Sequence, residues 1–353
     1  MNGADAPPVK SELSIRPYRE SDRAAWNAFV TQCPEATFFH RLEWRDLIED
    51  VFRHRTHYLL AECDGRIHAV LPLAEVKSFL FGHALVSLPF AERAGVAAID
   101  SRAVAPLHRA ARELAQSLGV EHLELRNAAR REPLWPEQDL YVSFSKAIVA
   151  DAEANLLAIP RKQRAMVRKG IQRGLASEID RSPRRFFDLY ANNVQRHGTP
   201  ALPRRYFEAL AETFGDQCEV LTVLDLQGRP VSAVMSFYFR DGVFPYYAGD
   251  GPTARDLAAN DFQYWELMRH ASQRGARWFD FGRSKRNTGP YDFKRNWGFT
   301  PEPLHYEYVL LKRATIPQNN PANPKYRAPR AVWQRLPRPV ANWLGPHIVR
   351  HLG

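Results

Sequence analysis

The sequence predicts an α/β (α+β) protein built from two domains and a basic tail. The chain has 353 residues, which is long for a single hydrophobic core. Its composition, 45% hydrophobic and 25% charged, is ordinary for a folded protein. A pattern of strands, a crossover helix and a further strand occurs twice. We place the two domains at residues 1–150 and 151–315, and the tail at residues 316–353.

The first copy of the pattern begins at His57. Two apolar strands flank a turn at residues 64–65, and a helix is expected over residues 103–118. Gly119 follows this helix and precedes a strand that begins at Glu121. A glycine just after a helix is typical of the position where φ is positive, so Gly119 marks the helix end.

The second copy begins at Glu219, with a turn at residues 227–229 and a helix over residues 261–273. The joints SLGVEHLELR and SQRGARWFDFG align without a gap, so that Gly119 matches Gly275 and Glu124 matches Asp280. We interpret the two halves as a structural repeat. The alternative is a chance match, because the halves share few identical residues.

Several classes of protein are disfavoured by simple patterns. No apolar run reaches the ~18 residues of a transmembrane helix, and the N-terminus lacks the apolar core of a secretory signal. The three cysteines lie far apart, without a CxxC motif or a Cys/His cluster, so no metal site is expected. These features predict a reduced, cytoplasmic protein.

The net charge of +10 is concentrated near the C-terminus, after Glu307. No acidic residue follows Glu307, whereas eight cations do: Lys312, Arg313, Lys325, Arg327, Arg330, Arg335, Arg338 and Arg350. The rest of the chain is close to neutral. Tail prolines exclude one long helix and leave room for short helices near residues 331–336 and 340–344. We favour a strap packed on both domains, with peripheral contact to an anionic membrane as the alternative.

The strand over residues 243–249, VFPYYAG, contains a proline. Because Pro245 has no N–H for a sheet ladder, it predicts a bulge or a gap beside the strand, unless this is an edge strand. Tyr247 in this strand is a candidate substrate-binding residue. The following loop leads into a helix N-terminus that favours anions, and Arg255 adds a cation. Ala258 and Asn260 occupy positions where a phosphate cradle needs glycine, which disfavours a coenzyme A pyrophosphate there.

The segment 275–299 carries the strongest chemical signal. Asp280 lies among apolar residues of an expected buried strand, where it serves either as a base or as a hydrogen-bond partner of a loop. Arg283 follows as a candidate substrate-binding cation. In the next helix, Tyr291 and Lys294 are three residues apart and share a face. A fixed ammonium there would stabilise a tetrahedral oxyanion, although a solvated surface lysine is the alternative.

A basic helix is expected from residue 161, where the chain reads RKQRAMVRKG. Arg161, Arg164 and Arg168 fall on one face of this helix. Such a face binds the phosphates of a nucleotide-linked sugar, of a lipid-linked precursor or of tRNA. A solvated cationic helix without a ligand is the alternative.

These motifs together resemble the Fem family of tandem GNAT transferases. The likeness rests on RKQRAMVRKG at residues 161–170, on WFDFG at residues 278–282 and on FKRNWG at residues 293–298. Over nearly its whole length the chain is similar to the FemAB-related proteins that accompany exosortase and PEP-CTERM exopolysaccharide systems. The segments FHRLEW, from residue 39, and NPKYRAPRAVWQRLPRP, from residue 323, are typical of that group.

The resemblance implies two tandem GNAT-like domains of the acyl-CoA N-acyltransferase type, with acceptor binding in the first and catalysis in the second. It implies transfer of an acyl or aminoacyl group to an amine of a cell-envelope or exopolysaccharide precursor. Acyl-CoA and aminoacyl-tRNA are the alternative donors, so tRNA is a candidate partner. The implied catalytic residue is Lys294, to which we add Asp280 and Tyr291. Arg164 and Arg168 match the substrate groove, to which we add Arg161, Tyr247, Arg255 and Arg283.

Two departures from the family pattern matter. No long helical arm is visible between residues 180 and 219, which counts against aminoacyl-tRNA as the donor. After the strand SLPF, the chain reads AERAGVAAID instead of a Tyr-Gly-Gly pattern, so the acceptor pocket is expected to differ. A catalytically degenerate scaffold protein of polysaccharide export and an RNA-binding protein are the rival functions.

Overall fold

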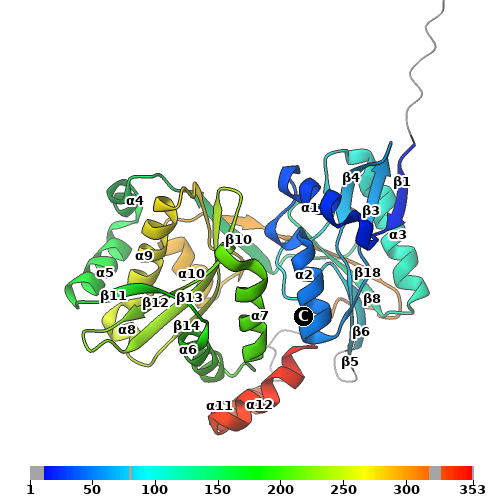
Figure 1. Cartoon of the computed structure of the whole chain (residues 1–353). Coiled ribbons are helices and arrows are strands. Elements are labelled where there is room, and N and C mark those ends of the chain that lie inside the picture. The colour runs from blue at the N-terminus through cyan, green and yellow to red at the C-terminus, as the bar shows by residue number, and fades with distance from the viewer. Residues whose placement is uncertain (1–11, 79–81, 318–326, 352–353) are drawn as a thin grey trace, which may run out of the picture.

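The computed structural model describes residues 12–78, 82–317 and 327–351. The described chain forms two α/β halves that lie side by side, with two C-terminal helices across one end (Figure 1). The mixed α/β fold class that the sequence predicts is confirmed.

The first half contains two sheets. Its strands are β1 (Ser14–Pro17), β2 (Arg55–Thr56), β3 (Leu59–Cys63), β4 (Arg66–Leu71), β5 (Ala74–Ser78), β6 (Gly82–Val86), β7 (Ala97–Ala98), β8 (His122–Asn127) and β9 (Glu137–Gln138). Its helices and helical turns are η1 (Glu20–Asp22), α1 (Arg23–Gln32), η2 (Phe38–His40), α2 (Leu42–Leu47), η3 (Ile48–Phe52), η4 (Ser101–Ala103) and α3 (Val104–Ser117).

The second half contains one larger sheet. Its strands are β10 (Tyr141–Ala147), β11 (Ala176–Asp180), β12 (Cys218–Leu224), β13 (Pro230–Phe239), β14 (Gly242–Asp250), β15 (Trp278–Asp280), β16 (Ser284–Lys285) and β17 (Pro301–Pro303). Its helices are α4 (Ala152–Ala158), α5 (Arg161–Gln172), α6 (Arg184–Arg196), α7 (Arg204–Phe214), α8 (Ala254–Leu257), α9 (Ala259–Gln273) and α10 (Gly289–Asn296), with the turn η5 (Gly215–Gln217). Strand β18 (His305–Leu310) and helices α11 (Arg327–Arg335) and α12 (Arg338–Val349) complete the chain.

The predicted repeat is present in both halves. In the first, β6 runs parallel to β8 and α3 makes the crossover between them. In the second, β14 runs parallel to β15 and α9 makes the crossover. Gly119 and Gly275 follow the two crossover helices with φ values of 66° and 91°, as expected for glycines that end a helix.

The sheets exchange strands between the halves. Strand β10 lies before residue 150 in the sequence, yet it pairs with β15 and β16 in the second sheet. Strand β18, which comes late in the chain, pairs with β8 and β9 in the first half. A domain boundary at residue 150 therefore separates each sheet from one of its strands, because the order of strand pairing differs from the order of the chain.

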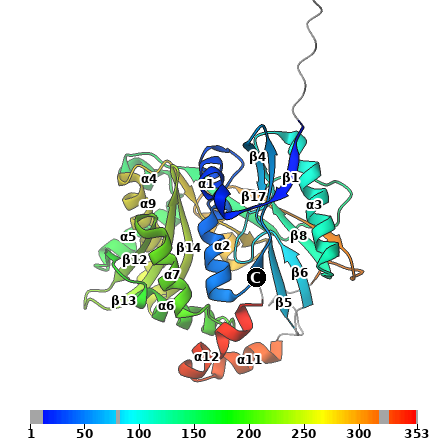
Figure 2. The ribbon, with the colours of Figure 1, turned by 45° about the vertical axis from the view of Figure 1, so that its right-hand side comes forward.

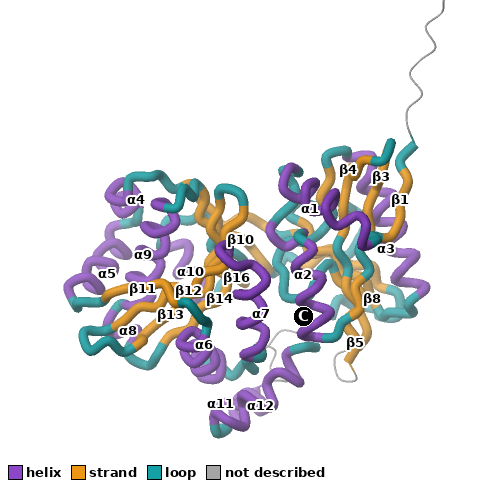
Figure 3. Tube along the Cα trace, viewed as in Figure 1, coloured by secondary structure: helices purple, strands orange, loops and turns teal. Residues whose placement is uncertain are grey.

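The halves also share a hydrophobic core. Figure 3 shows the second sheet between α5 and α9 on one side and α6 and α7 on the other, and α7 packs on α2 of the first half. Phe38 of the first half stacks on Phe237 of β13 with ring centroids 4.9 Å apart, and it also meets Phe214 of α7 at 4.7 Å. Burial of such large aromatic surfaces fixes the two halves against each other.

The tail is a strap packed on both halves, as the sequence analysis favours. Gln334 of α11 donates a hydrogen bond to the carbonyl oxygen of Arg196, and Gln195 donates one to that of Leu336. At the far end, Nε2 of His54 lies 2.7 Å from the carbonyl oxygen of Arg350. Figure 2 shows both tail helices at the same end of the molecule after a turn of the view. The described part of the chain contains no helix that is long and apolar enough to cross a membrane.

Helix α12 is longer than predicted, because it continues through Pro346 to Val349. Gly345 packs against the loop between α6 and α7. A Cβ added to Gly345 would lie 3.0 Å from the carbonyl oxygen of Ala201 in this loop. This close packing supports the last turn of the helix, and tertiary contact thus outweighs the local cost of proline.

Candidate active site

The strands β14 and β15 diverge after a short parallel contact. Their register pairs are only Gly242 with Trp278 and Val243 with Phe279. On its other side β14 shifts register against β13, because Met235 pairs with Tyr247 whereas Ser236 pairs with Pro245. The bulge predicted from Pro245 is thereby confirmed, and it lies where the two parallel strands separate.

A cavity of about 410 Å³ opens at this separation. Its walls come from β14, from the turn that follows β15, from α9 and α10, and from a loop of the first half. The lining residues are Phe90, Glu92, Leu202, Pro245, Tyr246, Tyr247, Ala248, Tyr264, Phe281, Gly282, Arg283, Pro290 and Lys294. Mostly apolar walls with a few charged groups are typical of a small-molecule site.

Lys294 reaches this cavity from α10, which begins with Pro290 in its first turn as predicted. Its Nζ donates hydrogen bonds of 3.0 Å to the carbonyl oxygens of Gly282 and Arg283. An ammonium has three N–H groups, so one donor remains for a bound molecule. Burial lowers the pKa of Lys294 from 10.5 to about 8, while the carboxylates of Glu92 and Asp280 oppose this shift.

Glu92 enters the same cavity from the first half. Its side chain is buried, and one carboxylate oxygen accepts a hydrogen bond from the backbone N–H of Arg283. Gly282, with a φ of 66°, allows this approach, since a Cβ there would lie 2.9 Å from a carboxylate oxygen of Glu92. Burial raises the pKa of Glu92 above its ordinary value, against the lowering effect of Arg93 and Lys294.

Arg93 links Glu92 to Asp280. Its Nη2 pairs with the carboxylate of Asp280 and lies 3.5 Å from an oxygen of Glu92. Asp280 also accepts a hydrogen bond of 2.8 Å from the backbone N–H of Gly282. Asp280 is therefore bound to the turn that shapes the cavity, and it lines a different cavity of about 190 Å³ on the far side of Arg93.

Arg283 is held between aromatic rings. Its guanidinium lies 4.4 Å from the ring centroid of Tyr141 and donates a hydrogen bond of 2.8 Å to the hydroxyl of Tyr306. Tyr306 in turn donates to the carbonyl oxygen of Glu92 at 2.7 Å. Tyr141 lies in β10 and Tyr306 in β18, the two strands that pair with a sheet of the other half. This exchange of strands therefore positions the guanidinium of Arg283.

Tyr247 also lines the cavity, as expected. Its hydroxyl lies 3.0 Å from that of Tyr206, and burial raises its pKa well above 10. The phenol therefore stays protonated and acts as a hydrogen-bond donor rather than as a base.

The remaining sequence candidates lie elsewhere. Tyr291 packs edge-on against Phe144, at a centroid distance of 5.5 Å, and does not line the cavity. Arg255 is exposed in α8. Arg161 and Arg168 are exposed on α5, which packs on α9 away from the cavity walls, and Arg164 donates to the carbonyl oxygen of Leu157 at 2.9 Å. The cavity thus unites Lys294, Arg283 and Tyr247, but not the other six candidates.

The N-terminus of α9 already has an anionic neighbour from the protein itself. The carboxylate of Asp250 accepts hydrogen bonds from Asn260, at 3.0 Å, and from Asn193. Arg196 pairs with the same carboxylate. Ala258 lies just before α9 with a φ of 57°, where glycine is the ordinary residue. These features agree with the expectation from the sequence that the N-terminus of α9 does not favour binding of a coenzyme A pyrophosphate.

Glu92 is the residue that sequence reasoning missed. The sequence offers one signal, an acidic residue inside the apolar stretch SLPFAERAGVAA. This stretch departs from the family pattern. Its position depends on Leu88 and Phe90, which have φ values of 65° and 63°. Left-handed backbone at such residues is uncommon and is not readable from the sequence.

The fold and this site define a mixed α/β protein with a GNAT-type domain. Residues 161–295 match the model of the acetyltransferase (GNAT) domain family. A comparison of the sequence with curated proteins gave no match.

Several solved structures share the fold. A crystal structure of FemX is 14% identical, with a TM-score of 0.64 over 85% of this chain and 98% of that one. The C-terminal domain of a putative lysylphosphatidylglycerol synthetase from Agrobacterium fabrum is 13% identical, with a TM-score of 0.56 over 83% and 92%. A tandem GNAT protein from the clavulanic acid biosynthesis pathway is 13% identical, with a TM-score of 0.51 over 84% and 97%. At these identities the likeness establishes the GNAT fold.

Proposed function

We propose that the protein is an N-acyl or aminoacyl transferase of the Fem/GNAT type. One observation carries the proposal: a half-buried cation, Lys294, and a buried carboxylate, Glu92, line one cavity at the gap between β14 and β15. Acyl transfer to an amine needs these two groups, because a proton must leave the amine while negative charge develops on the carbonyl oxygen.

In this mechanism the acceptor amine binds near Glu92 and the acyl carbonyl near Lys294. An alkylamine has a pKa of about 10.4 in water, so it must lose a proton before it attacks. Glu92 accepts this proton, and its raised pKa brings its basicity closer to that required at neutral pH. The amine nitrogen bonds to the carbonyl carbon and the free N–H of Lys294 meets the oxyanion. When the tetrahedral intermediate collapses, the bond to the thiolate or ribose oxygen of the donor breaks, and this leaving group takes the second proton of the amine.

For the substrates we propose an amine on a cell-envelope or exopolysaccharide precursor as acceptor, in keeping with the family resemblance. The same resemblance carries the suggested association with exosortase systems. For the donor we propose acyl-CoA or aminoacyl-tRNA, the two alternatives that the family resemblance implies. Arg283, which lies in the cavity, is suited to an anionic group of either substrate.

Incubation of the purified chain with aminoacyl-tRNA or acyl-CoA and with amine-bearing precursors tests the proposal. Mass spectrometry should find an acceptor that has gained the acyl group, and Lys294→Met and Glu92→Gln should abolish it. If folded Lys294→Ala protein supports an unchanged product in cells, the scaffold function holds instead. A thermal shift by coenzyme A alone would favour acyl-CoA as the donor.

A further inference from the structure

The outer face of the tail helices carries features that the transfer reaction does not use. Along α12, Val340, Trp343 and His347 are spaced three and four residues apart and are all exposed. Trp343 is 69% exposed, and Val332 of α11 is 63% exposed. The opposite side of α12 is buried at Ala341 and Gly345. Large apolar side chains in such a row on a soluble surface indicate a contact site.

The tail helices are also cationic. Arg335 of α11 and Arg338 of α12 are exposed, and no acidic residue occurs after Glu307. Cations that flank exposed tryptophan and aliphatic side chains fit an anionic lipid surface, where the apolar groups enter the acyl boundary and the cations meet phosphates. Nucleic acid would require the cations but not the apolar row.

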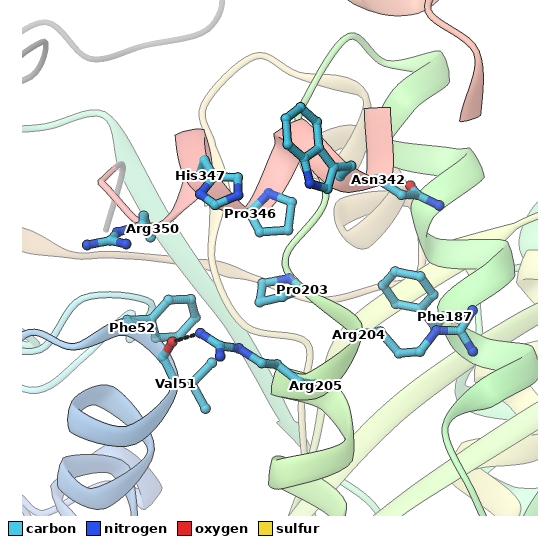
Figure 4. Close-up of a pocket in the computed structure, with 11 residues that line it drawn as sticks. Val51, Phe52, Phe187, Pro203, Arg204, Arg205, Asn342, Pro346, His347 and Arg350 are labelled. Atoms are coloured by element: carbon cyan, nitrogen blue, oxygen red, sulfur yellow. Dashed lines mark hydrogen bonds between the residues drawn. The ribbon is translucent and has the colours of Figure 1, made fainter. Parts of the chain in front are cut away.

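A cavity beside α12 extends the cationic surface onto the body of the protein. Its volume is about 540 Å³, and its lining includes Trp343 and His347 of α12 together with Arg204, Arg205 and Arg350. Figure 4 shows α12 on one side of this cavity, and Pro203, Val51 and Phe52 on the other. No aspartate or glutamate is among the lining residues, although Arg204 pairs with Asp188 nearby. The side chain Nε of Arg350 is buried and has no hydrogen-bond partner within the described ranges.

The strap also fixes this face relative to the candidate active site. Phe52, which lines the cavity beside α12, stacks on Phe90 of the active-site cavity with ring centroids 4.3 Å apart. Pro203 and Leu202 line the two cavities from neighbouring positions. The linings of the two cavities are thus in contact.

We infer that the outer face of α11 and α12 binds the surface of an anionic bilayer, with Val332, Val340 and Trp343 in the acyl boundary. This inference stands independently of the proposed acyl transfer. It places the active-site cavity close to the lipid headgroups, so that an acceptor held in the membrane could reach it without leaving the bilayer.

Flotation of the full-length chain with vesicles tests the inference. We expect flotation with vesicles that contain phosphatidylglycerol, little with pure phosphatidylcholine, and loss of binding as salt increases. Arg335→Gln with Arg338→Gln should lower partitioning about 30-fold, since each cation near the surface contributes about 1 kcal/mol. The matched control, Arg109→Gln with Arg112→Gln on exposed positions of α3, should partition as the wild type does.

Two further variants separate the apolar row from the charge. Trp343→Ser with Val340→Ser should also weaken flotation, whereas Leu134→Ser, at a side chain that is 96% exposed elsewhere, should not. Trp343→Phe should remove the blue shift of tryptophan emission that vesicles induce. Equal flotation of the tail variants and the wild type, or equal binding to neutral vesicles, overturns the inference. So does tail-dependent binding of RNA without binding of vesicles.

Discussion

The strongest test of the candidate site is the titration of Lys294, because it needs no substrate. Burial lowers the pKa of this lysine from 10.5 to about 8 in the folded protein, whereas the unfolded chain keeps the ordinary value. Between these two pH values the unfolded chain binds a proton that the folded chain does not. The free energy of unfolding therefore rises with pH across this window, by roughly 3 kcal/mol in all.

The variant Lys294→Met should lack this rise. At neutral pH it removes the cost of burying a charge, but it leaves the carbonyl oxygens of Gly282 and Arg283 without their donor, at about 1 kcal/mol each. We expect the variant to be no less stable than the wild type at pH 7, and catalytically inactive. A side chain that lowers the stability of the fold and is essential for activity is typical of a functional group.

Urea unfolding of both proteins at a series of pH values measures the effect. The stability of the wild type relative to Lys294→Met should increase by roughly 3 kcal/mol from about pH 7 to about pH 11. The exposed Lys162→Met on α5 serves as the control, with a difference that stays flat. If the difference in free energy of unfolding between the wild type and Lys294→Met does not change with pH, or if the variant is much less stable at pH 7, the argument is refuted. Lys294 would then be a structural residue.

Three further predictions concern the surrounding residues. Glu92→Gln should abolish transfer. In the wild type kcat/KM should fall as the pH is lowered through a pKa above that of an ordinary glutamate, because burial raises the pKa of Glu92; initial rates across pH check this. Asp280→Asn should destabilise the fold by about 3 kcal/mol in denaturant unfolding, since it leaves Arg93 buried beside one remaining carboxylate; unchanged stability would show that the pair is solvent-screened. Gly249→Ala should cost at least ~2 kcal/mol or prevent folding, because its Cβ would lie 2.3 Å from the backbone nitrogen of Tyr190; thermal melting of the purified variant decides.

Local features of the fold could be read from the sequence. The bulge at Pro245, the start of α10 at Pro290 and the glycines that end α3 and α9 each follow from the backbone chemistry of one residue. The basic stretch whose arginines fall on one helical face likewise forms a helix, α5, over Arg161–Gln172. These features can be predicted without tertiary information because they depend on the φ angle or the missing N–H group of a single residue.

The sequence by itself therefore determined a doubled α/β architecture and the helix that carries Lys294. Only the tertiary structure decided which residues meet Lys294 in the cavity. Glu92 lies about 200 residues earlier in the chain, and it reaches the site because aromatic packing joins the two halves and because β10 and β18 cross between them. Contacts over such a separation depend on how whole sheets pack and pair, which no local pattern encodes.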